Sequence, residues 1–533
     1  MDSLVTDTLV LIETGKLSGI RFDNATRAFL GIPYAAPPVG GQRWRPPKPA
    51  VAWQGVRAAM RFGPSSLQFP PPATSLYFGG ESDFSEDCLY LNVYTGPKES
   101  NDRPVLVWFH FGAFQMGSAM NPMYNGEKLA AEGITVVTVN YRLGVFGFLA
   151  HRWLSAESHL QASGNWGILD QIAALEWVQR NVRALGGDPS NVTIGGVSAG
   201  GSSVHILRTS RLAKSLFCKA ICESGPGIAR DLDGHGHFAT FTSLATAEEA
   251  GAELANLLGA SSIEELREMP AQNLMMTQLA RSQEPWESDL IPGSIGLSLF
   301  DTRYPIVDGH VLPVPPVAAF LSGKVADIPL MAGNEGNEGS GLMQIRSLVT
   351  YLEFVRATFG NHTDEALRLY PASSDAEALT SSAQFLSDQT FTYPVWTTVR
   401  LHARTLTSKV WYYQFHRAPP ITADSKVLER EYAGAFHGSA TLYMFGNLDA
   451  WKWDWTDGDR ELSRRMVKIT ALFLKTGRPA QDGNIWPAVN SGKPDCTVMF
   501  HDADCMSRLR QPPQRLQQIS AFWDRFYGFE HMC

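Results

Sequence analysis

A short apolar strand that runs directly into the pentapeptide Gly196-Val197-Ser198-Ala199-Gly200 is the feature that most constrains this chain. The β-branched residues over 192–195 predict the strand, and the small residues after Ser198 predict the start of a helix. Because two glycines leave space beside it, the serine hydroxyl is expected at a sharp strand-to-helix turn. The pattern alone is weak, since a chain this rich in Gly and Ser contains a G-x-S-x-G by chance roughly once in three or four sequences. The alternative is a packing turn without a catalytic role.

Apolar, β-branched runs alternate with helical stretches along the chain, which predicts an α/β fold with a large, mostly parallel sheet covered by helices on both faces. We expect strands at 105–110, 134–141, 192–195, 219–223, 328–332 and 410–415, and helices at 165–183, 461–475 and 514–526. No linker or repeat interrupts the pattern, so residues 1–533 are expected to form a single domain with long loop and helical insertions around the pocket. The Pro-rich loop at 66–80 is too long and apolar for a simple turn and is typical of a lid or pocket wall.

Composition and charge exclude several other classes of protein. The chain has 533 residues, of which 44% are hydrophobic, and this is ample for a large buried core. A net charge of −8 without a long block of Lys or Arg argues against nucleic acid as a partner. No apolar run approaches the roughly 20 residues of a membrane helix, and the first residues lack a basic segment. Neither a membrane anchor nor a signal peptide is therefore expected.

The cysteines and paired histidines do not indicate a metal centre. Six cysteines are sparse for this length and show no C-x-x-C spacing, which favours buried thiols in a reducing compartment over a disulfide framework. Cys218 and Cys222 are four residues apart and could face one another only on a helix. His235 and His237 have no Cys or acidic cluster at ligand spacing nearby, so a flexible loop is favoured over a metal site.

A serine at such a turn needs hydrogen-bond donors for the oxyanion that its attack creates. The backbone N–H of Ala199 can face the substrate oxygen from the start of the helix. The second half of an oxyanion hole is expected in the loop after an earlier strand, and residues 110–114 stand in that place. Gly112 and Ala113 are the candidate donors.

The acid and the base should follow the serine in that order. Glu335 and Glu338 lie in a loop after a predicted strand, and both qualify as the acid, so the pattern leaves this choice open. His437 is flanked by small residues that suit a loop approaching an active site, whereas His416 ends a strand and is expected to be structural. His205 should lie on the helix after the serine, out of reach. The histidines that follow Glu338 are His362, His402, His416, His437, His501 and His531.

Six blocks in order resemble the type-B carboxylesterase and lipase family, which includes the cholinesterases and fungal lipases. The blocks are GIPYAAPPVG at Gly31, EDCLYLNVY at Glu86, NYRLGVFGFL at Asn140, GNWGILDQIAALEWVQRNV at Gly164, GGDPSNVTIGGVSAGG at Gly186 and DIPLMAGNEGNEG at Asp327. The resemblance implies the α/β-hydrolase fold and a serine carboxylic-ester hydrolase that works through an acyl-enzyme. It implies Ser198 as nucleophile, Glu338 as acid and His437 as general base. It also implies an oxyanion hole formed by Gly112, Ala113 and Ala199, and no metal or organic cofactor.

Two departures from the family concern the substrate. The family commonly has Glu before the nucleophile, whereas this chain has Val197, so a cationic choline ester is expected to be a poor substrate. The usual glycine after His110 is Phe111, which predicts a restricted or reshaped acyl pocket. With Phe114 and Trp286 as further candidate pocket residues, we expect a small, apolar, uncharged ester.

Two further departures concern the surroundings of the site. The family counterpart of Cys88 in secreted members is bridged to an upstream cysteine, but no cysteine precedes Cys88 here. That bridge cannot form, which favours a cytoplasmic enzyme, expected as a monomer or homodimer. Ala440 stands where the family typically has an acidic residue shortly after the histidine.

Two rival functions use the same fold. A binding module that lost its catalytic residues is disfavoured, because Ser198, Glu338 and His437 are all present. An acyltransferase, lactone-forming or dehydratase-like relative stays open, because hydrolysis and transfer share the acyl-enzyme and differ only in the acceptor.

Overall fold

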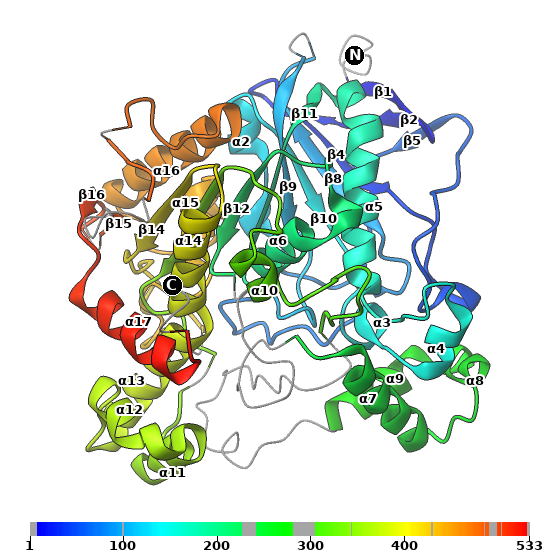
Figure 1. The fold of residues 1–533 in the computed structure, drawn as a ribbon. Helices are drawn as coiled ribbons and strands as arrows, with labels where there is room; N and C mark the ends of the chain where they lie inside the picture. The colour runs from blue at the N-terminus through cyan, green and yellow to red at the C-terminus, as the bar shows by residue number, and fades with distance from the viewer. Residues whose placement is uncertain are drawn as a thin grey trace.

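A large mixed sheet runs through the centre of the molecule (Figure 1). The computed structural model describes residues 8–98, 101–225, 241–280, 304–342, 344–427, 430–483, 485–489, 498–502 and 504–529. In these residues the 11-stranded sheet has the order β16-β15-β14-β13-β12-β11-β9-β10-β8-β4-β3. Its strands are β3 (Ile20–Arg21), β4 (Arg27–Pro33), β8 (Tyr90–Thr95), β9 (Arg103–Phe109), β10 (Thr135–Val139), β11 (Gly187–Val197), β12 (Lys219–Glu223), β13 (Leu330–Glu335), β14 (Val410–Phe415), β15 (Val498–His501) and β16 (Ser507–Arg510).

The pairing of the strands confirms the mostly parallel sheet. Every neighbouring pair from β10 to β15 is parallel, and antiparallel pairs occur only toward the two edges. A small sheet of β1 (Leu9–Ile12), β2 (Gly15–Ser18) and β5 (Val56–Ala58) and a pair formed by β6 (Ser65–Ser66) and β7 (Phe84–Ser85) lie outside it. Because the central strands are parallel, their carboxyl ends meet at one edge, where α/β enzymes place their sites.

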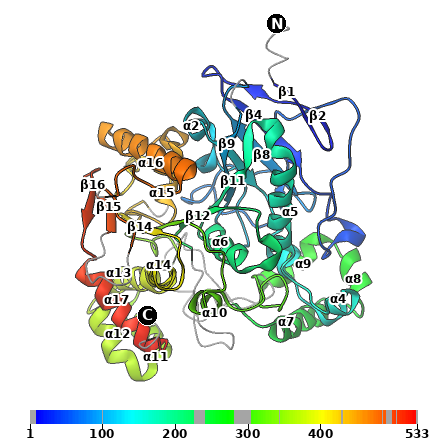
Figure 2. The ribbon, with the colours of Figure 1, turned by 45° about the horizontal axis from the view of Figure 1, so that its top comes forward.

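Helices cover both faces of this sheet, as the sequence predicts. Along β9, Val105, Val107 and Phe109 join one buried cluster, whereas Leu106 and Trp108 join another, because successive side chains of a strand point to opposite faces. The first cluster includes residues of α5 (Trp166–Asn181), α6 (Ala199–Thr209) and α14 (Tyr393–Thr405). The second includes residues of α2 (Glu127–Ala131), α15 (Ser439–Phe445) and α16 (Asp457–Thr476). Figure 2 shows α2 and α16 side by side, away from α5.

The remaining helices gather mainly beyond the carboxyl ends of the parallel strands. One group contains α7 (Leu244–Leu257), α8 (Ile263–Glu268) and α9 (Ala271–Ala280), and the other contains α11 (Leu348–Phe359), α12 (Thr363–Leu369) and α13 (Asp375–Leu386). Both groups lie at the lower end of the view in Figure 1. The other described helices are α3 (Gly144–Phe148), α4 (Arg152–Glu157), α10 (Pro316–Leu321) and α17 (Gln514–Phe526). These groups are insertions between successive strands of the sheet, the first between β12 and β13 and the second between β13 and β14.

The predicted boundaries are accurate where the local pattern is sharp. Strands β12 and β14 and helix α17 begin and end at the predicted residues. Strand β11 begins earlier than predicted, because Gly187 already pairs with Arg103 of β9. Strand β13 is shifted to Leu330–Glu335, because its pairing with β14 continues to Glu335. Such shifts depend on a neighbouring strand and are invisible in a local pattern.

Two ion pairs, one fully buried and one partly buried, involve residues of three family-like blocks. Arg142 binds Asp170 of α5 through two nitrogen atoms, each 2.7 Å from a carboxylate oxygen, and both side chains are buried. Arg43 contacts Glu86 at 2.5 Å and also donates to backbone carbonyls of residues 266–269. Fully paired and hydrogen-bonded groups of this kind hold loops in one arrangement, and removing one partner leaves a costly buried charge. The two pairs therefore have a structural role.

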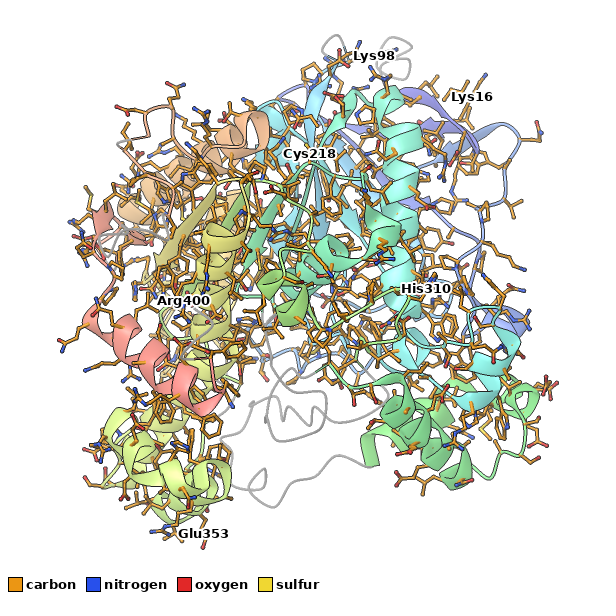
Figure 3. All side chains as sticks on the ribbon, in the orientation of Figure 1. Lys16, Lys98, Cys218, His310, Glu353 and Arg400 are labelled. Carbon is orange, nitrogen blue, oxygen red and sulfur yellow. The ribbon has the colours of Figure 1, made fainter. Side chains whose placement is uncertain are left out.

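The cysteines of the described segments carry no disulfide. Cys88, Cys222 and Cys505 are buried free thiols, as expected, but Cys218 is partly exposed. Cys218 precedes β12, so it does not share a helix with Cys222 and the two do not pair. Figure 3 shows Cys218 far from Glu353 of α11, with side chains filling the space between helices and sheet. His235 and His237 lie outside the described residues.

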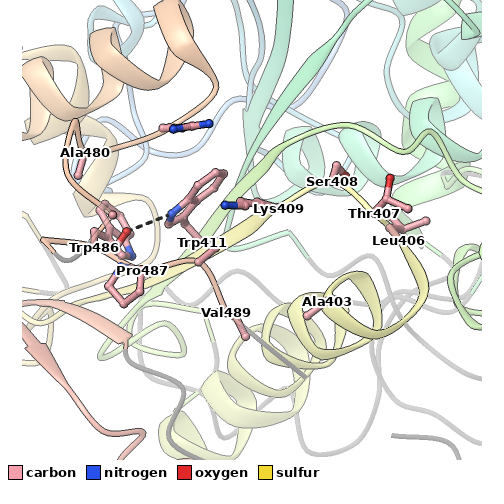
Figure 4. Close-up of a pocket in the computed structure, with 13 residues that line it drawn as sticks. Ala403, Leu406, Thr407, Ser408, Lys409, Trp411, Ala480, Trp486, Pro487 and Val489 are labelled. Carbon is pink, nitrogen blue, oxygen red and sulfur yellow. Dashed lines mark hydrogen bonds between the residues drawn. The ribbon is translucent and has the colours of Figure 1, made fainter. Parts of the chain in front are cut away.

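None of the helices in the described segments is long and apolar enough to cross a lipid bilayer. A pocket of about 410 Å³ opens beside the amino end of β14, lined by Lys409, Trp411 and residues of 478–489 (Figure 4). The Trp411 side chain donates to the backbone oxygen of Trp486 on its wall. None of the predicted catalytic residues lines this pocket, because they follow the opposite ends of the strands.

Candidate active site

Ser198 stands at a tight bend between β11 and α6. Its backbone has φ 59° and ψ −122°, a conformation that L-residues rarely adopt and that strained functional sites often contain. An added Cβ at Gly196 would lie 2.4 Å from the carbonyl carbon of Gly200, and one at Gly200 would lie 2.0 Å from the backbone oxygen of Phe109. Both glycines are therefore required. The Ser198 N–H donates to the backbone oxygen of Glu223 at 2.9 Å, which ties the bend to β12.

Glu338 and His437 meet at the carboxyl ends of the neighbouring strands. Glu338 follows β13, and His437 precedes α15; their loops are joined by a bridge between Asn337 and Phe436. The Nδ1 atom of His437 lies 2.5 Å from Oε2 of Glu338, and both side chains are buried. The structure thus brings Glu338, and not Glu335, against the imidazole.

The other imidazole nitrogen of His437, Nε2, is free to accept a proton. His437 Nε2 is buried and makes no hydrogen bond within the described residues, Ser198 included. A Cβ at Gly438 would lie 3.7 Å from the side chain of Val197, so the histidine loop borders the residue before the serine. Hydrogen bonds between a nucleophile and its base are often long without substrate and shorten when substrate binds.

Burial sets the protonation of this pair. It raises the pKa of Glu338 and lowers the pKa of His437, because each charged form loses its hydration. A lowered pKa keeps the imidazole neutral to more acidic pH, and the neutral form is the one that can accept a proton.

The loop after β9 lies against the elbow and presents free amides. Gly112 has φ 117°, and an added Cβ there would lie 2.0 Å from the Met116 backbone oxygen, so only glycine fits. Ala113 also has positive φ, at 51°. The N–H groups of Gly112, Ala113 and Ala199 donate to no group in the described parts of the chain. Unsatisfied amides near a nucleophile are the donors that an oxyanion hole requires.

The predicted pocket residues have different environments. Phe111 is buried edge-on against Tyr77, with ring centroids 5.7 Å apart, and Tyr77 in turn lies 6.5 Å from the His437 ring. Phe114 packs on Phe148 in the cluster on the other face of the sheet. Val197 is fully buried beside the histidine loop. Trp286 lies outside the described residues.

Sequence reasoning missed four residues that contact this centre. Phe391 lies 4.2 Å from the His437 ring, and Tyr77 comes from the Pro-rich loop that the sequence marks only as a lid or wall. Glu223 ends β12 and Ser224 follows it, and β12 lies between the strands that carry the serine and the acid. Their place at a carboxyl end was a signal that could have identified them.

Three buried side chains here have donor atoms that a metal ion could use, namely Glu335, Glu338 and His437. Two ligands of one zinc ion lie roughly 3 Å or more apart, because each is about 2 Å from the metal. The 2.5 Å between Glu338 and His437 is instead the length of a strong hydrogen bond. The residues present fit a hydrogen-bonded pair rather than an ion.

Comparison with known proteins gives consistent matches over most of the chain. A family model described as the carboxylesterase family matches residues 6–514. Fumonisin B1 esterase of Sphingopyxis macrogoltabida is 37% identical over 89% of this chain and 83% of its own length. Para-nitrobenzyl esterase of Bacillus subtilis (strain 168) is 34% identical over 91% of this chain and 93% of its own.

A solved structure of a PNB esterase superposes with a TM-score of 0.79 at 31% identity, and it covers 96% of this chain and 99% of its own. This likeness confirms the α/β-hydrolase fold that the sequence blocks imply. The enzymes that the chain resembles act on carboxylic esters, and the resemblance extends through the elbow and both loops that follow it. The chain therefore belongs to the carboxylesterase family and is an ester hydrolase.

Proposed function

We propose that this enzyme hydrolyses small, apolar, uncharged carboxylic esters through a covalent acyl-enzyme on Ser198. The observation that carries the proposal is the short hydrogen bond between Glu338 and His437 beside a serine held at a strained bend. Such an arrangement activates a hydroxyl that is a weak nucleophile on its own.

The steps follow from the positions of these groups. His437 Nε2 accepts the proton of Ser198 as the hydroxyl oxygen attacks the ester carbonyl, while Glu338 orients the ring and stabilises its charged form. The amides of Gly112, Ala113 and Ala199 stabilise the oxyanion. His437 then gives the proton to the leaving alcohol, and a water molecule, activated in the same way, releases the acid and regenerates the serine.

Apolar side chains around the imidazole support the choice of substrate. Tyr77 and Phe391 face the His437 ring, and Phe111 packs against Tyr77. Val197 provides no charge at the position before the nucleophile, so a cationic alcohol group gains no ionic partner there. Apolar pockets with few polar groups favour neutral ligands of matching shape.

Labelling with a fluorophosphonate probe, followed by peptide mapping, tests the proposal. We expect the modification on Ser198 and hydrolysis of p-nitrophenyl esters with a preference for one range of acyl-chain lengths. Folded protein without label on Ser198 would favour a binding module. Labelling combined with transfer of the acyl group to an added alcohol or amine, in preference to water, would favour an acyltransferase.

Phe111→Gly is expected to change the acyl preference. Removing the ring opens space next to the oxyanion loop, so the ratio of kcat/KM for long over short p-nitrophenyl esters should rise by roughly 10-fold, the value of a methylene or two in an apolar pocket. Phe359→Leu is the matched control, because Phe359 is a buried ring of α11 that packs on Phe385 and Trp523 and is not among the candidate pocket residues. An unchanged ratio in Phe111→Gly contradicts the assignment.

A further inference from the structure

One hydroxyl group stands between two buried carboxyl groups behind the Glu338–His437 pair. Ser224 Oγ lies 2.6 Å from Oε1 of Glu338 and is also in a short contact with Oε2 of Glu335. All three side chains are buried. The Ser224 backbone has φ 46°, and its N–H donates to Gly333 of β13 at 2.8 Å, so the hydroxyl is held in place by an unusual backbone conformation.

The number of hydrogen atoms available decides which of the two glutamates is protonated. A serine hydroxyl has one hydrogen and can donate to only one of the two carboxyl groups. Its other short contact needs a hydrogen from the carboxyl side, so one of the two glutamates is a carboxylic acid. Glu338 Oε1 already accepts the Glu335 N–H at 2.8 Å, and its Oε2 meets His437 Nδ1. Glu338 is surrounded by donors, which leaves Glu335 as the residue that holds the proton.

We propose that Glu335 is a positioning residue that acts as a carboxylic acid and holds Glu338 and the His437 loop through a hydrogen-bond chain. The hydrogen bonds run from Glu335 Oε2 to Ser224 Oγ, from Ser224 to Glu338 Oε1, and from His437 Nδ1 to Glu338 Oε2. The other oxygen of Glu335, Oε1, accepts the N–H of Ala440 at 3.2 Å, at the start of α15. The inference rests on the proposed function, since it assigns a role beside the same pair.

The contact with Ala440 gives this residue a second connection to the histidine. Members of the family that this chain resembles typically have an acidic residue at the position of Ala440. A carboxyl group supplied from the end of β13 contacts the backbone there instead. Glu335 therefore touches both the acid loop and the first turn after His437.

Burial and Glu338 favour the neutral form of Glu335, whereas hydrogen bonds with Glu223 and Ser224 oppose it. Glu223 from β12 is fully buried beside it and interacts with both Glu335 and Thr441. Glu338 adds a second acidic neighbour, and Tyr413 of β14 contributes only a phenol. The net effect, dominated by burial and then by the charge of Glu338, raises the pKa of Glu335 well above its ordinary value.

Glu335→Gln tests whether the site needs a neutral side chain at position 335 or a negatively charged one. Glu335→Gln keeps a donor toward Ser224 and an acceptor for Ala440, so it should retain most of the kcat at neutral pH. Glu335→Ala removes both, and kcat should fall by roughly 10- to 100-fold, the range seen when a supporting partner of a site is lost, with little change in KM. At alkaline pH the wild type should lose activity as Glu335 gives up its proton, and Glu335→Gln should not.

The thermal midpoint gives a readout that does not depend on hydrolysis. A carboxyl group whose pKa is raised on folding contributes less to the stability of the folded state as pH rises. The reason is that the folded state keeps a proton that the unfolded chain releases. The Tm of Glu335→Gln relative to wild type should therefore increase from pH 5 to pH 9. Glu353→Gln, on the exposed surface of α11 (Figure 3), is the matched control and should show no such trend.

Two results would overturn the proposed role of Glu335. One is a loss in Glu335→Gln as large as in Glu335→Ala, and the other is a Tm difference that stays constant with pH. If Glu335→Ala does not fold, Ser224→Ala in the wild-type and Glu335→Gln backgrounds provides the test, because linked residues give non-additive effects and independent ones add. Absence of label on Ser198 would instead contradict the proposed reaction, and it would leave the Tm trend intact.

Discussion

Ser198→Ala is expected to lower kcat for p-nitrophenyl ester hydrolysis by a factor of roughly 10⁴ to 10⁶, the scale found when a serine nucleophile is removed. The methyl group cannot form the acyl-enzyme, and the strained bend and its two glycines remain. Stopped assays with purified, folded variant measure the remaining rate. Residual hydrolysis should come from the oxyanion donors and substrate binding alone.

Ser203→Ala is a suitable control for this experiment. Ser203 lies on α6, the helix that follows Ser198, where it is buried, donates to the Ala199 backbone oxygen and accepts from Gln171. Ser203 contacts the Ala199 backbone oxygen but not the Ser198 hydroxyl or the amides of the oxyanion hole, so kcat per amount of folded protein should change by less than roughly threefold, while stability falls by about 1 kcal/mol. Wild-type turnover in Ser198→Ala would show that the chemistry proceeds elsewhere.

Glu338→Gln is expected to lower kcat by roughly 10³- to 10⁴-fold, because an amide orients the imidazole in the wrong tautomer and cannot stabilise its positive charge. The side chains have the same size, so the buried site should keep its shape. The rate of fluorophosphonate labelling should fall in parallel, since it depends on the same activated hydroxyl.

Comparison with Glu335→Gln decides which of the two carboxyl groups is the acid. Both residues are buried and three positions apart, yet only Glu338 meets Nδ1 of His437. The loss in Glu338→Gln should exceed that in Glu335→Gln by roughly 100-fold or more, if only the former supports the imidazolium. The opposite order would exchange the two assignments.

The local pattern predicted the elements that carry the site more accurately than their ends. The β-branched run before Ser198 and the small residues after it indicated the elbow, and the structure places both glycines where any side chain would collide with backbone. The strands Lys219–Glu223 and Val410–Phe415 were predicted with the correct first and last residues, because both are buried on two faces and bounded by polar residues. Where a strand end depends on pairing with a neighbour, as in β11 and β13, the prediction was displaced.

The partners of His437 show the limit of this reasoning. Its partners are distant in sequence: Tyr77 and Ser224 by hundreds of residues and Phe391 by tens of residues. No periodicity links them to the imidazole. Their roles arise from loop packing beyond the sheet edge. A pattern along the chain carries no information about which loops meet there.

The sequence by itself determined that the chain forms a parallel α/β sheet with a serine at a strand-to-helix bend, because strand and helix periodicity and the conformational freedom of glycine act between near neighbours. The local pattern left Glu335 and Glu338 open and the family resemblance implied Glu338, but only the tertiary structure shows that Glu338 faces His437 while Glu335 turns toward Ser224 and Ala440. The two glutamates are chemically identical, and what separates them is the direction in which a folded loop points each carboxyl group. That direction is set by contacts between strands β12, β13 and the loop before α15, which become neighbours only when the chain has folded.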